Sequence, residues 1–300
     1  MSAEPIRTET PVAFDTHSEA DGQWNELDWV PTTIYWGIHV LALGVLLVGP
    51  SATDLMLLAG AFWGRLIFIT GGYHRYFSHK SYKTSRAFQF FLAFMGTTCV
   101  QKGPLWWASL HRHHHRFSDQ PEDVHSPRQK GFWYAHQGWI EDPAWQATRL
   151  DYIPDFGKYP ELQFLNKWHV LGPAALITLC VAVGGFSGFL WGFCLATTML
   201  WHSTYTINSL SHRWGSARYD TGDDSRNNGF LALLTLGEGW HNNHHRYQAS
   251  ARNGFYWWEV DITYYVLLGL EKFGLVWDLR KPPEAVLAEG RGELPERKAA

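Results

Sequence analysis

Four long apolar segments, arranged in two pairs, restrict what this chain can fold into more than any other feature of its sequence. The first pair covers residues 30–49 and 54–73, and the second covers 168–184 and 186–206. A helix of about 20 apolar residues crosses the roughly 30 Å core of a bilayer. The breaks within the pairs, Gly-Pro-Ser in the first and Gly-Gly in the second, leave room only for tight helical hairpins. The pattern therefore predicts an all-α membrane protein with four transmembrane helices in two hairpins.

The distribution of charge predicts which side of the membrane each connection occupies. The turns inside both hairpins contain no Lys or Arg, whereas basic residues are frequent in segments 74–167 and 207–280. Because basic loops stay in the cytoplasm, we expect these segments to form a cytoplasmic helical cap, with both termini on the same side. The polar ends, 1–28 and 281–300, lack apolar periodicity, so we expect a flexible N-terminal arm and a flexible C-terminal tail around a membrane domain at 29–280.

Histidines are concentrated in boxes within the two cytoplasmic segments. Two boxes have the pattern H-x-x-H-H, one formed by His111, His114 and His115 and the other by His241, His244 and His245. Residues at i, i+3 and i+4 share one face of an α-helix, so each box presents three imidazoles together. His113 lies about 200° round the helix from His111, so we expect it to be exposed or outside a ligand set. We interpret His125 and His136, just downstream, as polar support for a loop.

Two further pairs of candidates lie before and between these boxes. His74 and His79 are at i and i+5, a spacing that leaves one α-helical face, so we expect this pair to span a helix end. Asn208 and His212, at i and i+4, share a face at the end of the last apolar segment. Together the candidates are too many ligands for one ion and about right for two. Imidazole nitrogen binds iron, copper, zinc and nickel, and an apolar site with room for a dioxygen-derived oxidant favours iron.

The ordered set of boxes resembles the membrane fatty-acyl desaturases, and the match is best for the bacterial form of the acyl-CoA (stearoyl-CoA) Δ9 type. The likeness covers roughly residues 30–280 and includes segment 222–228 before the last box and segment 261–265 after it. It implies an oxidoreductase in the bacterial inner membrane, with its active site facing the cytoplasm. A single H-x-x-H-H motif is common, whereas the ordered set with its spacings is specific.

The resemblance also implies the site and its chemistry. Nine histidines would ligate a di-iron centre: His74, His79, His111, His114, His115, His212, His241, His244 and His245. Asn208 would hold a water on one iron, and the spacing leaves open which histidine serves which iron. With O2 as co-substrate, the reduced centre would remove two neighbouring hydrogens from a palmitoyl or stearoyl thioester, leaving a cis double bond at Δ9.

Partners follow from what the sequence lacks. It has no flavin or dinucleotide fingerprint and no fused haem domain, so electrons are expected from a separate ferredoxin or cytochrome b5-like donor with its reductase. The segment before the second box, Trp107-Ala-Ser-Leu110, lacks the charges of the acyl-CoA relatives, so coenzyme A, carrier protein and phospholipid remain open as acyl carriers. A net charge of −3 and the lack of a basic, aromatic-rich patch argue against a nucleic-acid partner.

Two other functions fit part of the pattern. A membrane alkane or fatty-acid hydroxylase shares the boxes and would insert oxygen instead of removing a second hydrogen; the pair Asn208 and His212 favours desaturation. A haem or metal carrier would place its ligands within the spans, where Arg65 is the one internal charge. The sequence contains no H-E-x-x-H, which excludes a metalloprotease of that type.

Overall fold

The computed structural model describes residues 29–293, so the expected arm at 1–28 and residues 294–300 lie outside it. This part of the chain is mostly helical, which confirms the predicted helical class. Its sheet consists of two short antiparallel strands, β1 (Lys83–Thr84) and β2 (Val276–Trp277).

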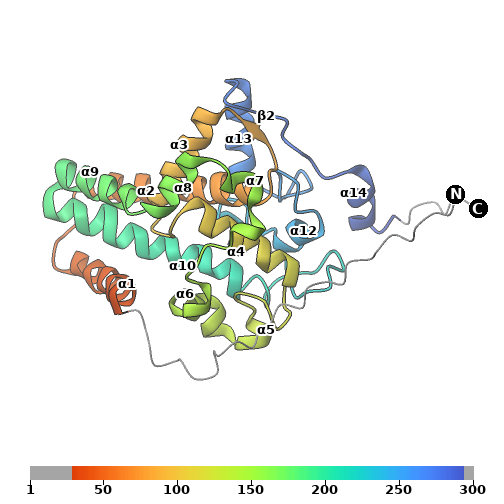
Figure 1. Ribbon diagram of the computed structural model, residues 1–300, viewed down its shortest axis with the longest axis horizontal. Coiled ribbons are helices and arrows are strands. Elements are labelled where there is room, and N and C mark those ends of the chain that lie inside the picture. Colours follow the sequence, from red (N-terminus) through yellow and green to blue (C-terminus); the bar gives the residue numbers. More distant parts are fainter. Residues whose placement is uncertain (1–28, 294–300) are drawn as a thin grey trace, which may run out of the picture.

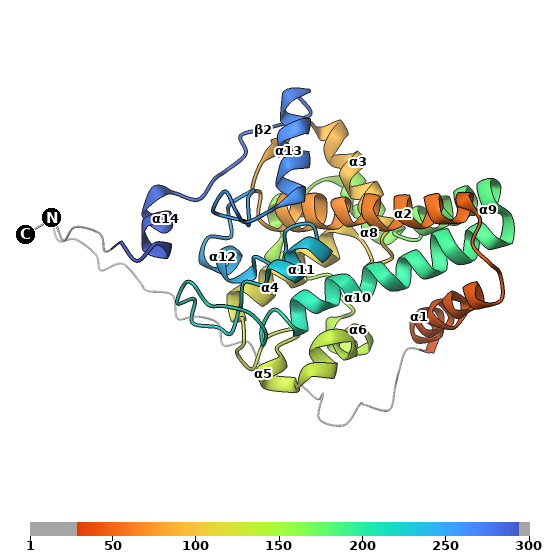
Figure 2. The same ribbon diagram turned by 180° about the vertical axis from the view of Figure 1, so that it is seen from behind.

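Two helical stretches are long and apolar enough to cross a membrane, judged by length and composition. In the first, α2 (Ala52–Ile67) continues into the π-helix η2 (Phe68–Ser78). In the second, α9 (Leu171–Gly188) is followed by the π-helix η6 (Phe189–Leu195) and by α10 (Ala196–Ser209). In both views α2 and α10 lie side by side (Figures 1 and 2).

Local signals explain where these stretches begin and turn. Ser51 and Asp54 form a capping box at the start of α2, and the Ser187 hydroxyl donates to Asp54 Oδ2 at 2.9 Å, which joins the two stretches. Gly185 has φ 61° and ψ −147°, a conformation open to glycine, and the chain reverses there, at the break that the sequence indicates. A Cβ on Gly192 would lie 2.9 Å from Cys180 Sγ, so the two arms are in close contact.

Two of the predicted spans differ from the helices observed. The helix α1 (Trp29–Ala42) tightens into the 3-10 turn η1 (Leu43–Leu46) and ends before residue 49. Its 14 α-helical residues and the four residues of η1 together rise about 29 Å, close to the roughly 30 Å of a bilayer core. The span predicted from 168 begins at Leu171, because the preceding helix α8 (Pro160–Lys167) ends at Trp168.

Arg65, the charge inside the second predicted span, faces the protein interior. Its Nη1 donates to the Thr98 carbonyl at 3.0 Å and to Thr197 Oγ1 at 2.9 Å, and its Nε donates to the Ala61 carbonyl at 2.6 Å. The guanidinium therefore links α2 to α10 and to the end of α3 (Arg86–Thr97).

The remaining helices include those that carry the second and third boxes. The longer ones are α4 (Pro104–Phe117) and α13 (Ile262–Lys272). Short helices connect α4 to α8: α5 (Pro127–Lys130), η3 (Tyr134–Gly138), α6 (Trp139–Glu141), η4 (Pro143–Trp145), η5 (Leu150–Tyr152) and α7 (Pro154–Gly157). After α10 come α11 (Gly229–Leu234), α12 (His241–Arg246) and α14 (Glu284–Gly290).

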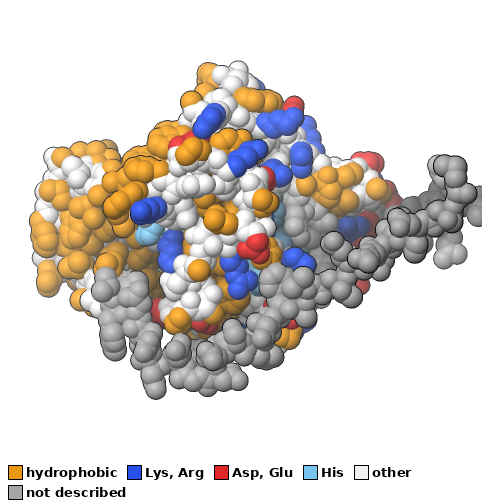
Figure 3. All heavy atoms as spheres, viewed as in Figure 1, with side chains coloured by type: hydrophobic (Ala, Val, Ile, Leu, Met, Phe, Trp, Pro, Cys, Tyr) orange, Lys and Arg blue, Asp and Glu red, His pale blue; other side chains and the backbone are white. Residues whose placement is uncertain are grey.

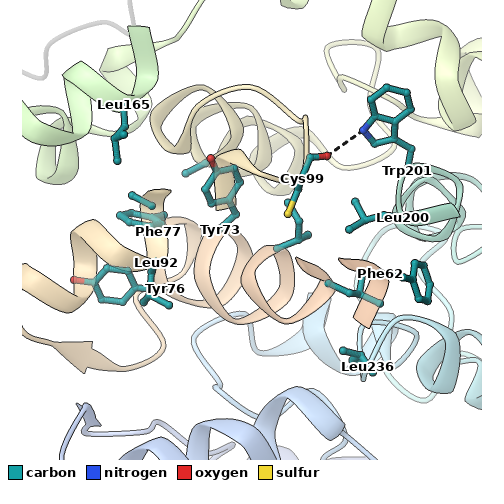
Figure 4. Packing of buried hydrophobic residues seen from close by; sticks show 14 of the residues in the cluster. Phe62, Tyr73, Tyr76, Phe77, Leu92, Cys99, Leu165, Leu200, Trp201 and Leu236 are labelled. Carbon is teal, nitrogen blue, oxygen red and sulfur yellow. Dashed lines mark hydrogen bonds between the residues drawn. The ribbon is translucent and has the colours of Figure 1, made fainter. Parts of the chain in front are cut away.

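The main core lies where α2, η2, α3 and α10 meet. Buried aromatic and aliphatic side chains from these helices form one cluster, including Phe62, Tyr73, Leu92 and Leu200 (Figure 4). Trp201 Nε1 donates to the Cys99 carbonyl at 3.1 Å, which ties α10 to the end of α3. The core therefore fixes the helices from which the first two boxes project.

Exposed apolar side chains are concentrated at one end of the molecule, over α1, α2 and α9 (Figure 3). Examples are Val40, Leu46, Met56, Val181 and Phe186. Lys and Arg appear over the remaining described surface in this view (Figure 3). The surface thus separates into an apolar end and a charged end, as expected if the apolar end meets lipid.

The predicted flexible tail from 281 is helical in part, which corrects that expectation. Val286 on α14 is buried against Tyr219 and Tyr256, whose hydroxyls donate to the carbonyls of Val286 and Leu287 at 3.0 and 2.8 Å. Composition indicated disorder because it gives no sign of this long-range apolar contact.

Candidate metal centre

The first box lies on a π-helix, which explains its unusual spacing. In η2 the His79 amide donates to the His74 carbonyl at 3.2 Å, an i to i+5 bond. One π-turn brings the two rings together, with centroids 4.8 Å apart. The expectation that the pair spans a helix end is confirmed, since η2 ends at Ser78 and His79 is its C-cap.

The second and third boxes lie on α-helices, as their spacing predicts. Pro104 starts α4 at its first turn, a position where proline costs no hydrogen bond, and the second box occupies the last turns of this helix. The third box is the short helix α12, whose first residue is His241. His212 follows the end of α10 and lies 3.1 Å from His241, measured between the Nε2 atoms.

The structure brings the nine predicted histidines into two groups, in each of which the possible ligand atoms lie within 4.8 Å of one another. One group, here called the five-histidine cluster, consists of His74, His79, His111, His115 and His244. The other, the four-histidine cluster, consists of His114, His212, His241 and His245. Metal binding by these residues remains a prediction.

The spacing of the ring nitrogens fits one metal ion per cluster. In the five-histidine cluster, neighbouring Nε2 atoms are 2.9 to 3.0 Å apart. Ligand nitrogens at right angles, each about 2.0–2.1 Å from one ion, would be about 3 Å apart. In the four-histidine cluster the Nε2 atoms of His114 and His245 are buried and have no hydrogen-bond partner. Both donor sets therefore suit a borderline transition metal.

The two H-x-x-H-H boxes divide between the clusters in opposite ways. On α4, the i and i+4 residues His111 and His115 belong to the five-histidine cluster, and His114 belongs to the other. On α12, the i and i+4 residues His241 and His245 belong to the four-histidine cluster, and His244 belongs to the other. Each helix therefore contributes to both clusters.

Burial keeps most of these imidazoles neutral, the form that binds metal. It lowers the pKa of His79, His111, His115 and His244 well below the usual range, and neighbouring histidines lower each pKa further. Burial also lowers the pKa of His245 to about 4, although Asp223 opposes the change. At His114 burial also acts to lower the pKa. The carboxylates around it, Asp123 first, outweigh burial, so the pKa of His114 is raised.

Four carboxylates that the sequence analysis did not assign contact the Nδ1 atoms of cluster histidines. Asp123 lies 2.8 Å from His114 Nδ1, Asp119 lies 2.8 Å from His212 Nδ1, and Asp223 lies 2.5 Å from His245 Nδ1. Glu238 lies 2.6 Å from His74 Nδ1. The three aspartate contacts are hydrogen bonds, and each sets the tautomer that leaves Nε2 free for a metal. A sequence signal existed, because Asp119 and Asp123 follow the second box directly and Asp223 lies in segment 222–228.

Glu238 is itself held by a buried charge network. The Arg75 side chain is fully buried, and its Nη2 lies 2.9 Å from Glu238 and 3.0 Å from Asp261. Asn253 Nδ2 donates to Glu238 Oε2 at 3.1 Å. Since a buried carboxylate needs such partners, this network fixes the orientation of His74 through Glu238.

Two cavities lie beside the clusters and share a wall. The first encloses about 450 Å³ of empty space, partly open to solvent, and is lined by His74, His241 and apolar residues such as Leu66 and Ile69. The second, of about 440 Å³, is lined mainly by aromatic residues including Trp106, Trp139 and Tyr205. Both are lined by Trp107, His111, Thr204 and Asn208. Asn208 therefore lies at the junction of the two cavities, and it shares the lining of the first with histidines from both clusters.

Three histidines that the sequence analysis placed outside the ligand set also lie outside the two clusters. His113 is buried, with Nε2 2.7 Å from the Glu122 carbonyl and Nδ1 3.0 Å from Arg149, as expected for a residue outside the ligand set. His136, predicted to support a loop, lies on η3 and hydrogen-bonds to Ser209 and His202 of α10, so it joins two helices. His125 lies in a further group with His114 and Asp123 and lines the second cavity.

A sequence profile of the fatty acid desaturase family matches residues 50–277, which include every residue of both clusters. The chain belongs to the fatty acid desaturase family. This confirms the resemblance drawn from the boxes.

Individual desaturases similar to this chain differ in double-bond position and in acyl carrier. The icosanoyl-CoA 5-desaturase of Limnanthes douglasii is 38% identical over 280 residues, which cover 89% of this chain and 77% of that protein. The sn-1 stearoyl-lipid 9-desaturase of Anabaena variabilis is 37% identical, covering 85% and 94%. The palmitoyl-monogalactosyldiacylglycerol delta-7 desaturase of Arabidopsis thaliana is 36% identical, covering 88% and 71%.

Proposed function

We propose that this chain is an O2-dependent di-iron desaturase that introduces a cis double bond at Δ9 of a palmitoyl or stearoyl chain. The nine clustered histidines would hold two irons, and Asn208 would hold a water on one of them. The observation that carries the proposal is that both histidine clusters line the first cavity, through His74 and His111 of one cluster and His241 of the other, and that His111 also lines the second cavity.

The junction suits an extended alkyl chain. Trp107, His111 and Asn208 line both cavities, so an alkyl chain in either one would lie against these side chains. Trp107 Nε1 donates to Gln101 Oε1, and Gln101 Nε2 donates to Thr204 Oγ1, both at 3.0 Å. These bonds fix the wall of the junction, so the protein determines which carbon pair lies beside the clusters.

The chemistry of the substrate explains why no acid, base or nucleophile is assigned among the side chains. An unactivated methylene has no acidic proton and no leaving group. A di-iron centre would supply, with O2, two electrons and two protons, the oxidising power to convert two methylenes to an alkene and release two waters. Apolar side chains such as Leu66 and Ile69 line the first cavity, and the carboxylates that contact Nδ1 hold the imidazole rings in place.

The position of the double bond and the acyl carrier are the most specific parts of the proposal. Similar desaturases include 5-, 7- and 9-desaturases and act on acyl-CoA or on lipid. We assign Δ9 to this chain, on the resemblance of its boxes to the Δ9 type and on the similar stearoyl-lipid 9-desaturase. The acyl group is carried as a thioester or as a lipid.

We also propose four membrane spans in the bacterial inner membrane, with the clusters and both termini in the cytoplasm. The reversal at Gly185 divides Leu171–Ser209 into two antiparallel arms, which supports the second hairpin. The lack of Lys and Arg in both hairpin turns supports the orientation. A ferredoxin or cytochrome b5-like protein with its reductase would deliver electrons from the cytoplasm.

Expression in a host that makes no unsaturated fatty acids tests this function. We expect a new cis-9 monoene from palmitate or stearate, detected by gas chromatography–mass spectrometry after derivatisation of the double bond, and its loss in His241→Ala. The lipid and thioester fractions, analysed separately after a short isotopic pulse, identify the carrier. A hydroxy acid in place of the alkene would establish the hydroxylase, and a purified protein without iron would contradict the metal assignment.

A further inference from the structure

Two segments around α11 expose large apolar side chains but no charge. Residues 227–240 and 254–265 contain three charged residues, Glu238, Glu259 and Asp261, and all three are buried. Apart from Gly229, the exposed residues of these segments are aromatic or aliphatic: Phe230, Leu233, Trp257, Trp258, Val260 and Tyr265. A soluble surface of this size would ordinarily carry exposed charges, so a patch without them indicates contact with another molecule or with lipid.

Contacts between the two segments join their exposed side chains into one patch. Trp240 Nε1 donates to the Val260 carbonyl at 2.8 Å, and the Thr263 amide donates to the Leu236 carbonyl at 2.9 Å. A Cβ on Gly229 would lie 3.5 Å from the Trp240 ring. Trp214, which is also exposed, lies beside Phe230 with ring centroids 6.4 Å apart. The resulting patch, here called the α11 surface, consists of Trp214, Phe230, Leu233, Trp257, Trp258 and Val260.

The segment that carries α11 also borders the substrate space. Thr235, which ends α11, and Glu238 line the first cavity together with Ile207 of α10 and Leu66 of α2. The helices α2 and α10 belong to the two stretches that are long and apolar enough to cross a membrane. The segment from Gly229 to Glu238 therefore contributes both to the α11 surface and to the wall of the first cavity.

The composition and the position of the α11 surface indicate that lipid covers it. Three of its six residues are tryptophans, the side chain that is enriched where a membrane meets water. The helix α13, which follows Trp258 in the chain, runs across the direction of α2 and α10 in both views, as a helix in the plane of the interface would (Figures 1 and 2). The helix α11 packs against α10, so the patch continues the apolar surface of a predicted span.

We propose that the α11 surface lies in the bilayer interface and that an acyl chain enters the first cavity from the bilayer beside α11, so that the substrate is the acyl chain of a membrane glycerolipid. The use of the chain rests on the proposed function, whereas its entry requires no reaction. Among the described residues that line the two cavities there is no Lys or Arg, the side chains that would bind the phosphates of a soluble coenzyme thioester. A glycerolipid needs no such cation there, because its headgroup stays in the interface.

Spin labels test the position of the α11 surface without any turnover. A label at Leu233→Cys is compared with one at Ala285→Cys, an exposed position on the short helix α14, in the full-length, iron-loaded protein in phosphatidylcholine–phosphatidylglycerol nanodiscs. The three native cysteines are buried and stay unlabelled. We expect the label at Leu233→Cys to collide more often with O2, which concentrates in lipid, than with a water-soluble nickel complex, and the label at Ala285→Cys to show the reverse.

A photoreactive phospholipid tests entry into the first cavity. The nanodiscs contain phosphatidylcholine with a diazirine in the middle of its palmitoyl chain, and mass spectrometry locates the crosslinks formed on irradiation under argon. We expect crosslinks to Leu66 and Ile69, which are buried and line the first cavity. Leu233→Asp places a carboxylate on the α11 surface and should lower their yield about fivefold. Leu150→Asp, at an exposed leucine on η5, is the matched control and should leave the yield unchanged.

The outcomes separate this proposal from the desaturase function. The proposal fails if the label at Leu233→Cys responds as the label at Ala285→Cys does, or if the phospholipid marks only the outer faces of α2 and α9. It also fails if palmitoyl-CoA with the same diazirine marks Leu66 and the phospholipid does not. Phospholipid crosslinks to Leu66 in a protein that forms no alkene in the expression host would contradict the proposed function and support the entry route.

Discussion

The two histidine clusters are built from the same side chain but are held in different ways. In the four-histidine cluster, Asp123, Asp119 and Asp223 each hold one imidazole at Nδ1. In the five-histidine cluster, among the described residues, Glu238 is the one carboxylate in such a contact. The Nδ1 atoms of His115 and His244 there are buried without a partner.

This difference indicates that carboxylates orient the imidazoles of the four-histidine cluster. The five-histidine cluster depends more on the contacts among its own imidazoles. A carboxylate behind an imidazole fixes the ring and makes its free nitrogen a stronger ligand. The four-histidine cluster is therefore organised before a metal binds. In the five-histidine cluster, Nε2 atoms about 3.0 Å apart crowd lone pairs together, and an ion would relieve that repulsion.

Removal of one ligand from each cluster should have the largest effect. His79→Ala affects only the five-histidine cluster and His212→Ala only the other, because neither residue lies on α4 or α12, which serve both. We expect each variant to lose desaturation by more than the roughly 100-fold cost typical of an outer partner. Each should retain one iron of two, as measured by metal analysis and Mössbauer spectroscopy of the purified protein.

Loss of both irons to the same extent in both variants would contradict the distinction between the two clusters. The clusters would then bind metal as one unit, and the carboxylates on one side would not organise that side independently. A Leu179→Ala variant, at an exposed position on α9, serves as the control for purification losses.

Substitution of a carboxylate should have a smaller effect, confined to one cluster. Asp119 Oδ2 accepts from His212 and from the Asp224 amide, so the carbonyl oxygen of an asparagine would take its place. His212 Nδ1 would then keep a hydrogen bond but lose the negative charge that strengthens it. We expect Asp119→Asn to weaken iron binding at the four-histidine cluster by about 10- to 100-fold, measured by chelator competition.

Asp155→Asn provides the matched control. Asp155 is a partly buried aspartate that pairs with Arg112 and Lys80 and contacts no histidine. Its substitution should leave both iron affinities unchanged. If Asp119→Asn weakened the five-histidine cluster equally, the distinction between the clusters would be wrong.

The sequence predicted the ligand candidates better than their arrangement. The i, i+3, i+4 spacing correctly indicated helical boxes, because helix geometry is local. It could not assign His114 and His244 to clusters different from those of their neighbours, because that division depends on how α4 and α12 face each other across more than 120 residues of sequence. The Asp119 contact with His212 was out of reach for the same reason.

The fold shows the same limit. Apolar runs located α2 and α10, but the helix α14 depends on contacts with Tyr219 and Tyr256 that no local pattern records. The π-turn between His74 and His79 was likewise unforeseen, although their i, i+5 spacing is the spacing that such a turn needs.

The smallest effect is expected at His113, which lies within a box but outside both clusters. Its ring bonds to the Glu122 carbonyl and to Arg149, so His113→Gln should cost roughly 0.5–1.5 kcal/mol of stability through weakened hydrogen bonds. Iron content and desaturation should stay within about threefold of the unmodified protein. Losses of up to about 100-fold are typical of residues that hydrogen-bond to a metal ligand, and His113 contacts none. His114→Gln, one residue away, should instead lose iron. If His113→Gln lost iron to the same degree, membership of a box, and not of a cluster, would decide function, and the two-cluster description would need revision.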